Sequence, residues 1–137
     1  MKKKLINISL YYAIAAMVGG AFYREFTKWN GFTGVTALGK VHVHLFVLGM
    51  AVFLIAALFS ERQNLAASKK WNVFMRFYNI GLILAVIMLV VRGVAQVLAI
   101  PLSTGMSAAI SGVAGLGRII LAIGMIAFLL CLKETAE

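Results

Sequence analysis

Acidic residues are scarce in this chain. Only 4 of the 137 residues are Asp or Glu, against 13 Lys and Arg, and none of the four lies inside an apolar core of a long hydrophobic run. One cysteine, Cys131, excludes an internal disulfide, and the only proline is Pro101. No separate water-soluble domain carries the net charge of +9, so the charge does not indicate nucleic-acid binding.

Long hydrophobic runs make up most of the chain. Its composition is 63% hydrophobic with a mean hydropathy of +0.99, which excludes a soluble domain. A spanning helix needs about 20 mostly apolar residues. We therefore predict an all-α, polytopic membrane protein, a single domain over 1–137 with spans at about 5–23, 38–59, 73–99 and 108–132. The first run resembles a signal peptide but is long for one and lacks a small-residue cleavage site, so we expect it to be retained.

The basic residues predict the orientation of the spans. Those on the predicted inner side are Lys2, Lys3, Lys4, Arg62, Lys69, Lys70, Arg76 and Lys133. The other two connections hold only Arg24, Lys28 and Lys40. By the positive-inside rule, we predict that both termini are cytoplasmic. Aromatic residues suit both interfaces, with Trp71, Phe74, Phe77 and Tyr78 inside and Tyr23, Phe26, Trp29 and Phe32 outside.

Two segments near the outer side are rich in small residues. The connection 24–37 carries glycines and aromatics, which fit either an ordered cap on the bundle or an interfacial loop. Segment 103–117 contains the small-xxx-small pairs Ala108/Gly112 and Ser111/Gly115. Such pairs let helix backbones approach closely in lipid. Close packing is the expected role of this segment, and a backbone ligand site is the alternative.

The two histidines, His42 and His44, are the most informative residues. Each helical residue turns about 100°, so side chains two positions apart point to nearly opposite sides. One metal ion could hardly bind both histidines, whereas two cofactors on opposite sides of the helix could each bind one. Arg92 and Arg118 lie in spans that contain no acid, which leaves an anion missing, and arginine pairs well with the propionates of a haem.

Less specific roles exist for each of these residues. Arg92 could extend toward the interface with Gln96 and pair with Glu25, the nearest internal acid. Arg118 could bind carbonyl groups of the small-residue segment. An intramembrane histidine is often a hydrogen-bonded packing residue.

The stretch His42-Val43-His44-Leu45-Phe46-Val47-Leu48-Gly49-Met50-Ala51-Val52-Phe53 resembles the tenth helix of the haem-copper oxidase catalytic subunit. The two histidines of that helix ligate two different haems. That subunit has three arcs of four helices, and this chain resembles one arc, with its histidine pair on the second helix. The chain departs from the family in having no further histidine for a copper centre.

The whole chain also resembles a family of small four-span bacterial membrane proteins of unknown function. The resemblance rests on four stretches: Phe22-Tyr23-Arg24-Glu25-Phe26-Thr27, His42-Val43-His44-Leu45, Tyr78-Asn79-Ile80-Gly81 and Ser111-Gly112-Val113-Ala114-Gly115. It implies the bacterial cytoplasmic membrane and no established activity.

The oxidase resemblance implies a homotrimer that recreates twelve helices, with haem b between subunits. His42 and His44 of different subunits would be the axial ligands, and Arg92, Arg118 or Arg24 would hold the propionates. Two imidazoles leave no open position for oxygen, so we expect no catalytic residues but electron transfer, redox sensing or haem handling. Cys131 is not in a Cys-x-x-Cys-His motif, so the haem would not be covalently attached.

Two other functions stay open. A small transporter or channel would line a path for an anion, a proton or a metal ion with these residues. The first span lacks the acid that small multidrug exporters use. A structural accessory subunit would tolerate replacement of both histidines. Copper or zinc would need further ligands from neighbouring subunits, and membrane lipid is the remaining expected partner.

Overall fold

Four long helices form the protein, and the computed structural model describes residues 1–136. Each is long and apolar enough to cross a membrane, so the chain is an all-helical, multi-pass membrane protein. No strand occurs among the described residues. The predicted spans lie on these helices, although the third helix ends two residues early, before Ala99 with its positive φ. The four are α1 (Lys2–Trp29), the second crossing (Ala37–Phe59), the third crossing (Lys69–Val97) and α6 (Thr104–Thr135).

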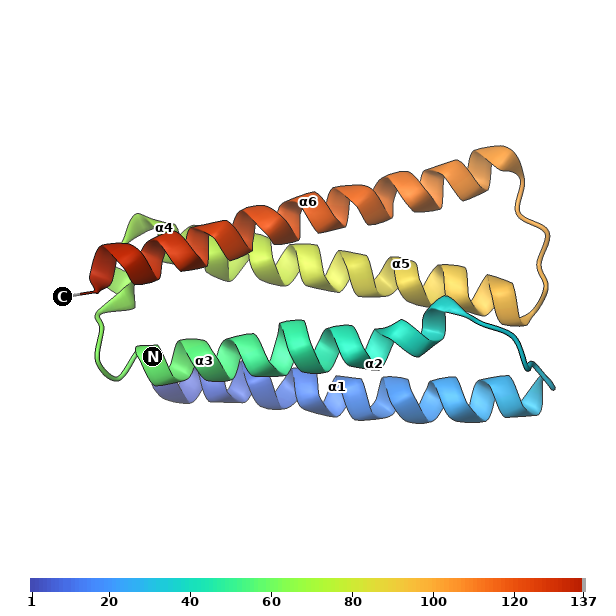
Figure 1. Ribbon diagram of the computed structural model, residues 1–137, viewed down its shortest axis with the longest axis horizontal. Helices are drawn as coiled ribbons and strands as arrows, with labels where there is room; N and C mark the ends of the chain where they lie inside the picture. Colours follow the sequence, from blue (N-terminus) through green and yellow to red (C-terminus); the bar gives the residue numbers. More distant parts are fainter. Residues whose placement is uncertain (137) are drawn as a thin grey trace.

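The four helices run antiparallel to their neighbours in sequence (Figure 1). Both ends of the chain and connection 60–68 lie at one end of the bundle, here called the terminal half. Connections 30–36 and 98–103 lie at the opposite end, the distal half. The third crossing packs most extensively on α6, and α1 packs on the second crossing. The bundle is therefore two helical hairpins placed side by side.

The second and third crossings each contain a wider, π-helical stretch. The second crossing runs through η1 (Ala37–Lys40), α2 (Val41–His44), η2 (Leu45–Ala51) and α3 (Val52–Phe59). The third runs through α4 (Lys69–Val73), η4 (Phe74–Tyr78) and α5 (Asn79–Val97). Here η2 and η4 are π-helical. Such stretches disturb the regular hydrogen bonding of a helix, and in lipid any freed group needs another partner.

Side chains supply those partners. In η2, the Tyr78 hydroxyl donates to the Leu48 carbonyl at 2.8 Å, and Ser9 Oγ donates to the Met50 carbonyl at 2.9 Å. In η4, Asn79 Nδ2 donates to the Met75 carbonyl at 2.7 Å. The Tyr12 hydroxyl then donates to Asn79 Oδ1 at 2.6 Å. These polar side chains join α1 to the other two crossings through the two wide turns.

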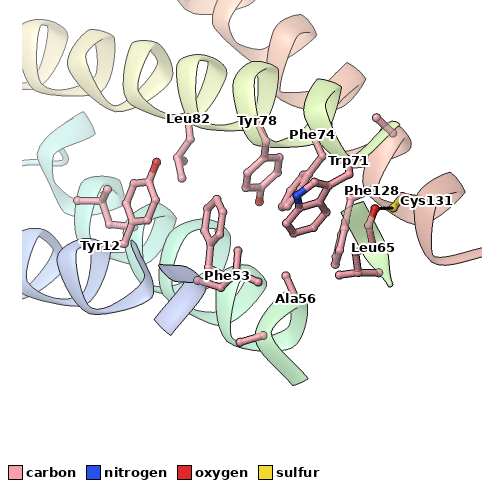
Figure 2. Close-up of a cluster of buried hydrophobic side chains, with 14 of the residues drawn as sticks. Tyr12, Phe53, Ala56, Leu65, Trp71, Phe74, Tyr78, Leu82, Phe128 and Cys131 are labelled. Carbon is pink, nitrogen blue, oxygen red and sulfur yellow. Dashed lines mark hydrogen bonds between the residues drawn. The ribbon is translucent and has the colours of Figure 1, made fainter. Parts of the chain in front are cut away.

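Aromatic side chains fill the terminal half. Figure 2 shows Phe53, Trp71, Phe74, Tyr78 and Phe128 meeting between the helices. Phe74 stacks on Phe128 with ring centroids 4.5 Å apart and is fully buried. Of the four aromatics expected at the inner interface, only Phe77 is exposed. Residues 71, 74 and 78 follow the helical repeat, so they share the face that packs on the bundle.

Glycines let α6 approach the third crossing closely, but they are not the expected ones. A Cβ added at Gly81 would lie 2.3 Å from the Leu121 nitrogen, and one at Gly124 would lie 2.5 Å from the Tyr78 nitrogen. At Gly112 and Gly115, nothing lies within 4 Å of an added Cβ. The pairs Ala108/Gly112 and Ser111/Gly115 therefore do not mediate close packing within this chain, and Ala108 and Ser111 are exposed.

The connection after α1 ends in contact with α5. Thr36 Oγ1 donates to the Gly93 carbonyl at 3.0 Å, and the Ala37 amide donates to Gln96 Oε1 at 2.8 Å. Gly93 is required here because an added Cβ would lie 2.6 Å from the Leu38 nitrogen. The expected connection 24–37 is shorter in the structure, because its first six residues continue α1 to Trp29. Its end packs on α5, where residues 36–38 fix the start of the second crossing, whereas Val35 is 92% exposed.

Candidate functional site

A cavity of about 180 Å³ lies from the middle of the bundle toward its distal half. It brings together three of the predicted site residues, His44, Arg92 and Arg118, from three different crossings. The rest of its lining is apolar and consists of Leu48, Ala85, Met88, Leu89, Ala114 and Leu121. An apolar wall with a few convergent polar groups is typical of a ligand site.

His44 is held in one orientation by its own helix. Its Nδ1 lies 2.8 Å from the Lys40 carbonyl. A carbonyl oxygen can only accept, so this hydrogen bond requires the proton on Nδ1. In the neutral ring, Nε2 then carries the free electron pair. Histidines that bind metals commonly have their second nitrogen anchored in this way.

Arg92 reaches from α5 to the first turns of α6. Its Nη2 donates to the Ser107 carbonyl at 3.2 Å and to Ser111 Oγ at 2.7 Å. The alternative pairing with Glu25 is not formed, since Glu25 lies 3.9 Å from Arg24 instead. Arg92 is therefore positioned by neutral partners, which leave its positive charge uncompensated.

Arg118 completes the cavity from α6 and is exposed on the bundle surface. It follows Gly117, where α6 lies against the third crossing and an added Cβ would lie 3.1 Å from the Ala85 nitrogen. The hydrogen bonds to carbonyls expected as an alternative role do not occur among residues 1–136. Two arginines and a histidine thus line one cavity that includes no Asp or Glu.

The other two predicted residues lie elsewhere. His42 faces α1, where its ring stacks on Tyr23 at a centroid distance of 6.5 Å and lies beside Gly20. His42 Nδ1 is buried and finds no hydrogen-bond partner within residues 1–136. Arg24 is 82% exposed and does not line the cavity. The opposed directions expected for two helical residues at this spacing are observed, so the histidines serve different surroundings.

This arrangement can bind an anionic group beside a nitrogen ligand. Two guanidinium groups supply donors for carboxylate or phosphate, and the apolar wall strengthens their attraction by excluding water. Within the described residues, no group of three or more His, Cys, Asp or Glu could hold a metal ion. One anchored imidazole, two arginines and an apolar wall are the kinds of group that the iron, propionates and ring of a haem would require, but the cavity of about 180 Å³ is smaller than the usual ligand site of about 300–1,000 Å³.

Sequence reasoning missed the residues that position the site. Ser111 and Ser107 hold Arg92, and the Lys40 carbonyl holds His44. The tyrosine network at η2 was also missed. The signal available was the presence of hydroxyl and amide side chains inside apolar spans, which need partners in lipid.

Family comparison confirms the expected membership of a family of unknown function. The family described as "Protein of unknown function (DUF2871)" matches residues 1–135. The chain belongs to this family. No curated protein and no solved structure matches the chain.

Proposed function

We propose that this protein is an integral membrane haem-binding protein of the b-type cytochrome kind. His44 is one axial ligand, and Arg92 and Arg118 hold the propionates. The second axial ligand is His42 of the partner subunit, so that each haem is shared between two copies. The bound haem supplies one-electron chemistry, which suits electron transfer, redox sensing or haem handling.

The observation that carries this proposal is the anchored ring of His44 in a cavity with two uncompensated arginines. The Lys40 carbonyl selects the tautomer whose Nε2 can bind a metal. Ser111 fixes Arg92 at 2.7 Å without neutralising it. Charged residues inside a membrane are costly and usually mark a functional site.

The size of the cavity supports sharing between subunits. Ligand sites usually measure about 300–1,000 Å³, and this cavity of about 180 Å³ is smaller. His42 and His44 face different elements, so one chain does not bring both to one iron. The open surfaces of Gly112 and Gly115 leave room for a neighbouring helix. A homotrimer with cyclic symmetry would let each subunit give one histidine to each of its two interfaces, which requires the His42 ring to turn from α1 toward the neighbouring subunit.

The basic residues of the terminal half support an orientation with both termini in the cytoplasm. The cavity then lies toward the outer side of the bacterial cytoplasmic membrane. An electron partner on the outer side of the membrane would therefore approach the protein near His44 and the two arginines.

An absorption spectrum of protein purified from haem-replete cells tests the proposal. We expect sharp reduced bands of a bis-histidine haem, and we expect His44→Ala and His42→Ala each to remove them. Val43→Ala, a change on the same turn at an exposed position, should retain them. A colourless wild-type protein that remains folded would overturn haem binding, and an unchanged spectrum in both histidine variants would overturn the ligand assignment.

The assembly is tested separately by the mass of the protein in detergent. We expect a trimer whose haem content falls with dissociation. A monomer that carries a full complement of haem would contradict the shared site while leaving haem binding itself intact.

A small-anion site is the second candidate function. A cavity of about 180 Å³ with no acid in its lining would hold a small anion within a single subunit, without the shared assembly that a haem requires. In this case Arg92→Gln and Arg118→Gln would abolish anion flux into liposomes. Because no haem would be bound, the absorption spectrum of His44→Ala would be the same as that of the wild-type protein. Retention of flux in both arginine variants would exclude it.

A further inference from the structure

A second cavity lies in the terminal half, away from His44. It measures about 460 Å³ and lies between the first turn of α1 and the start of the third crossing. Two of its lining residues, Lys4 and Arg76, have cationic side chains, Met1 also lines it, and no acidic side chain does. Trp71, Asn72, Leu5 and Met75 form further parts of its wall.

The acids near this cavity are already paired with other cations. Glu61 forms an ion pair with Lys2, and Glu134 lies 2.7 Å from Lys70 Nζ. Neither Lys4 nor Arg76 forms an ion pair within the described part of the chain. The cavity therefore carries two positive charges that no protein group neutralises there.

We propose that this cavity binds the headgroup of an anionic phospholipid. Lys4 and Arg76 pair with the phosphate, and Asn72 offers an amide to the glycerol or headgroup oxygens. Trp71 and Leu5 are 7% and 0% exposed, so they form a rigid apolar side of the cavity. Tryptophan is favoured at the level of the lipid headgroups.

The location selects a lipid over a soluble anion. The cavity lies at the basic end of a membrane-spanning bundle, where the chain carries most of its lysines and arginines. Basic pockets between membrane helices attract anionic headgroups. Beyond Met75 and Arg76, the third crossing carries the exposed apolar side chains of Phe77 (42%) and Ile80 (57%). A phospholipid would gain contacts between its acyl chains and such apolar surface, whereas free phosphate would not.

The test counts bound lipids by native mass spectrometry on the full chain. Phosphatidylglycerol and phosphatidylcholine with identical acyl chains are added in turn to delipidated protein. The wild-type protein should retain phosphatidylglycerol in preference to phosphatidylcholine. The double variant Lys4→Gln/Arg76→Gln should lose about 20-fold in phosphatidylglycerol affinity.

The control is Lys3→Gln/Lys133→Gln, which removes the same charge at the same end from residues outside the cavity. It should keep the preference, and Arg76→Lys, which retains the charge, should keep most of it. Equal loss in the cavity and control variants would overturn the proposal. Displacement of the lipid by millimolar inorganic phosphate would also overturn it, since the site would then belong to a soluble anion.

Discussion

In the terminal half, Phe53, Phe74 and Tyr78 are fully buried and their rings touch, whereas the distal half encloses a cavity with two arginines. The same contrast appears along α6, where Gly124 touches Tyr78 and Gly112 touches nothing. The aromatic interior of the terminal half therefore contributes stability, and the cavity lined by Lys4 and Arg76 lies beyond it, beside the first turn of α1. In the distal half, by contrast, the charged groups Arg92 and Arg118 lie along the spans themselves, as is common at functional sites.

The largest expected effect is the loss of an aromatic ring from the terminal half. Phe74→Ala should lower the free energy of unfolding by about 3 kcal/mol, because it leaves a void among rings that cannot close it. Phe22→Ala is the matched change in the distal half, where Phe22 is 41% exposed, and it should cost less than about 1 kcal/mol. Unfolding in detergent measures both free energies. Equal losses in the two variants would contradict the difference in packing between the two halves.

A single methyl group should distinguish the two parts of α6. Gly124→Ala forces a Cβ to within 2.5 Å of the Tyr78 nitrogen and should destabilise by about 2 kcal/mol. Gly112→Ala meets nothing and should be neutral or stabilise by up to about 1 kcal/mol through helix propensity. The measurement is the same unfolding series. A large loss at Gly112 would show instead that this surface is covered, which the trimer test would then identify.

Removing a positive charge from the cavity should raise the free energy of unfolding, whereas Phe74→Ala and Gly124→Ala lower it. Arg118→Gln removes an exposed charge from a cavity that contains no acid, so it should stabilise the ligand-free protein by about 1 kcal/mol. The control Arg62→Gln lies in connection 60–68 and should change stability by less than about 0.5 kcal/mol. If Arg118→Gln instead destabilises the protein, Arg118 is a structural residue, and the charged groups of the distal half do not lower its stability.

The smallest effect concerns an ion pair at the end of the terminal half. The Lys2 ammonium, which hydrogen-bonds the Glu61 carboxylate, holds the pKa of that carboxyl below its usual range. A carboxyl with a lowered folded-state pKa stabilises the fold at neutral pH, and this contribution disappears as the pH falls through that lowered value. Because both groups are exposed, the effect is small. Unfolding measured from pH 7 to 3 should show a slightly shallower loss for Glu61→Gln, and an identical slope would contradict it.

The number, type and approximate limits of the helices follow from the sequence. About 20 apolar residues must form a helix in lipid, because no other local structure satisfies their backbone groups. The opposed directions of His42 and His44 also follow, since helical geometry alone sets them. These features depend on local periodicity and need no knowledge of the partners.

The partners of the polar groups could not be predicted in this way. The spacing of Ser111 and Gly115 indicated close packing, yet Ser111 holds Arg92 and Gly115 faces open space. The aromatic residues at 71, 74 and 78 were assigned to an interface by their type, whereas the helix face decides their burial. Each error arose because the rotation of a helix about its axis depends on the neighbours it packs against.

The sequence alone established an all-helical membrane protein with two opposed histidines and too few acids for its arginines, because composition and periodicity act within a single helix. The tertiary structure established that His44, Arg92 and Arg118 share one cavity while His42 and Arg24 do not. It also showed that tyrosine, serine and asparagine side chains satisfy the two π-helical turns. Those relations depend on how three crossings are rotated and shifted against one another. The close approaches at Gly81, Gly117 and Gly124 set the register between the third crossing and α6, and the close approach at Gly93 sets that between α5 and the second crossing.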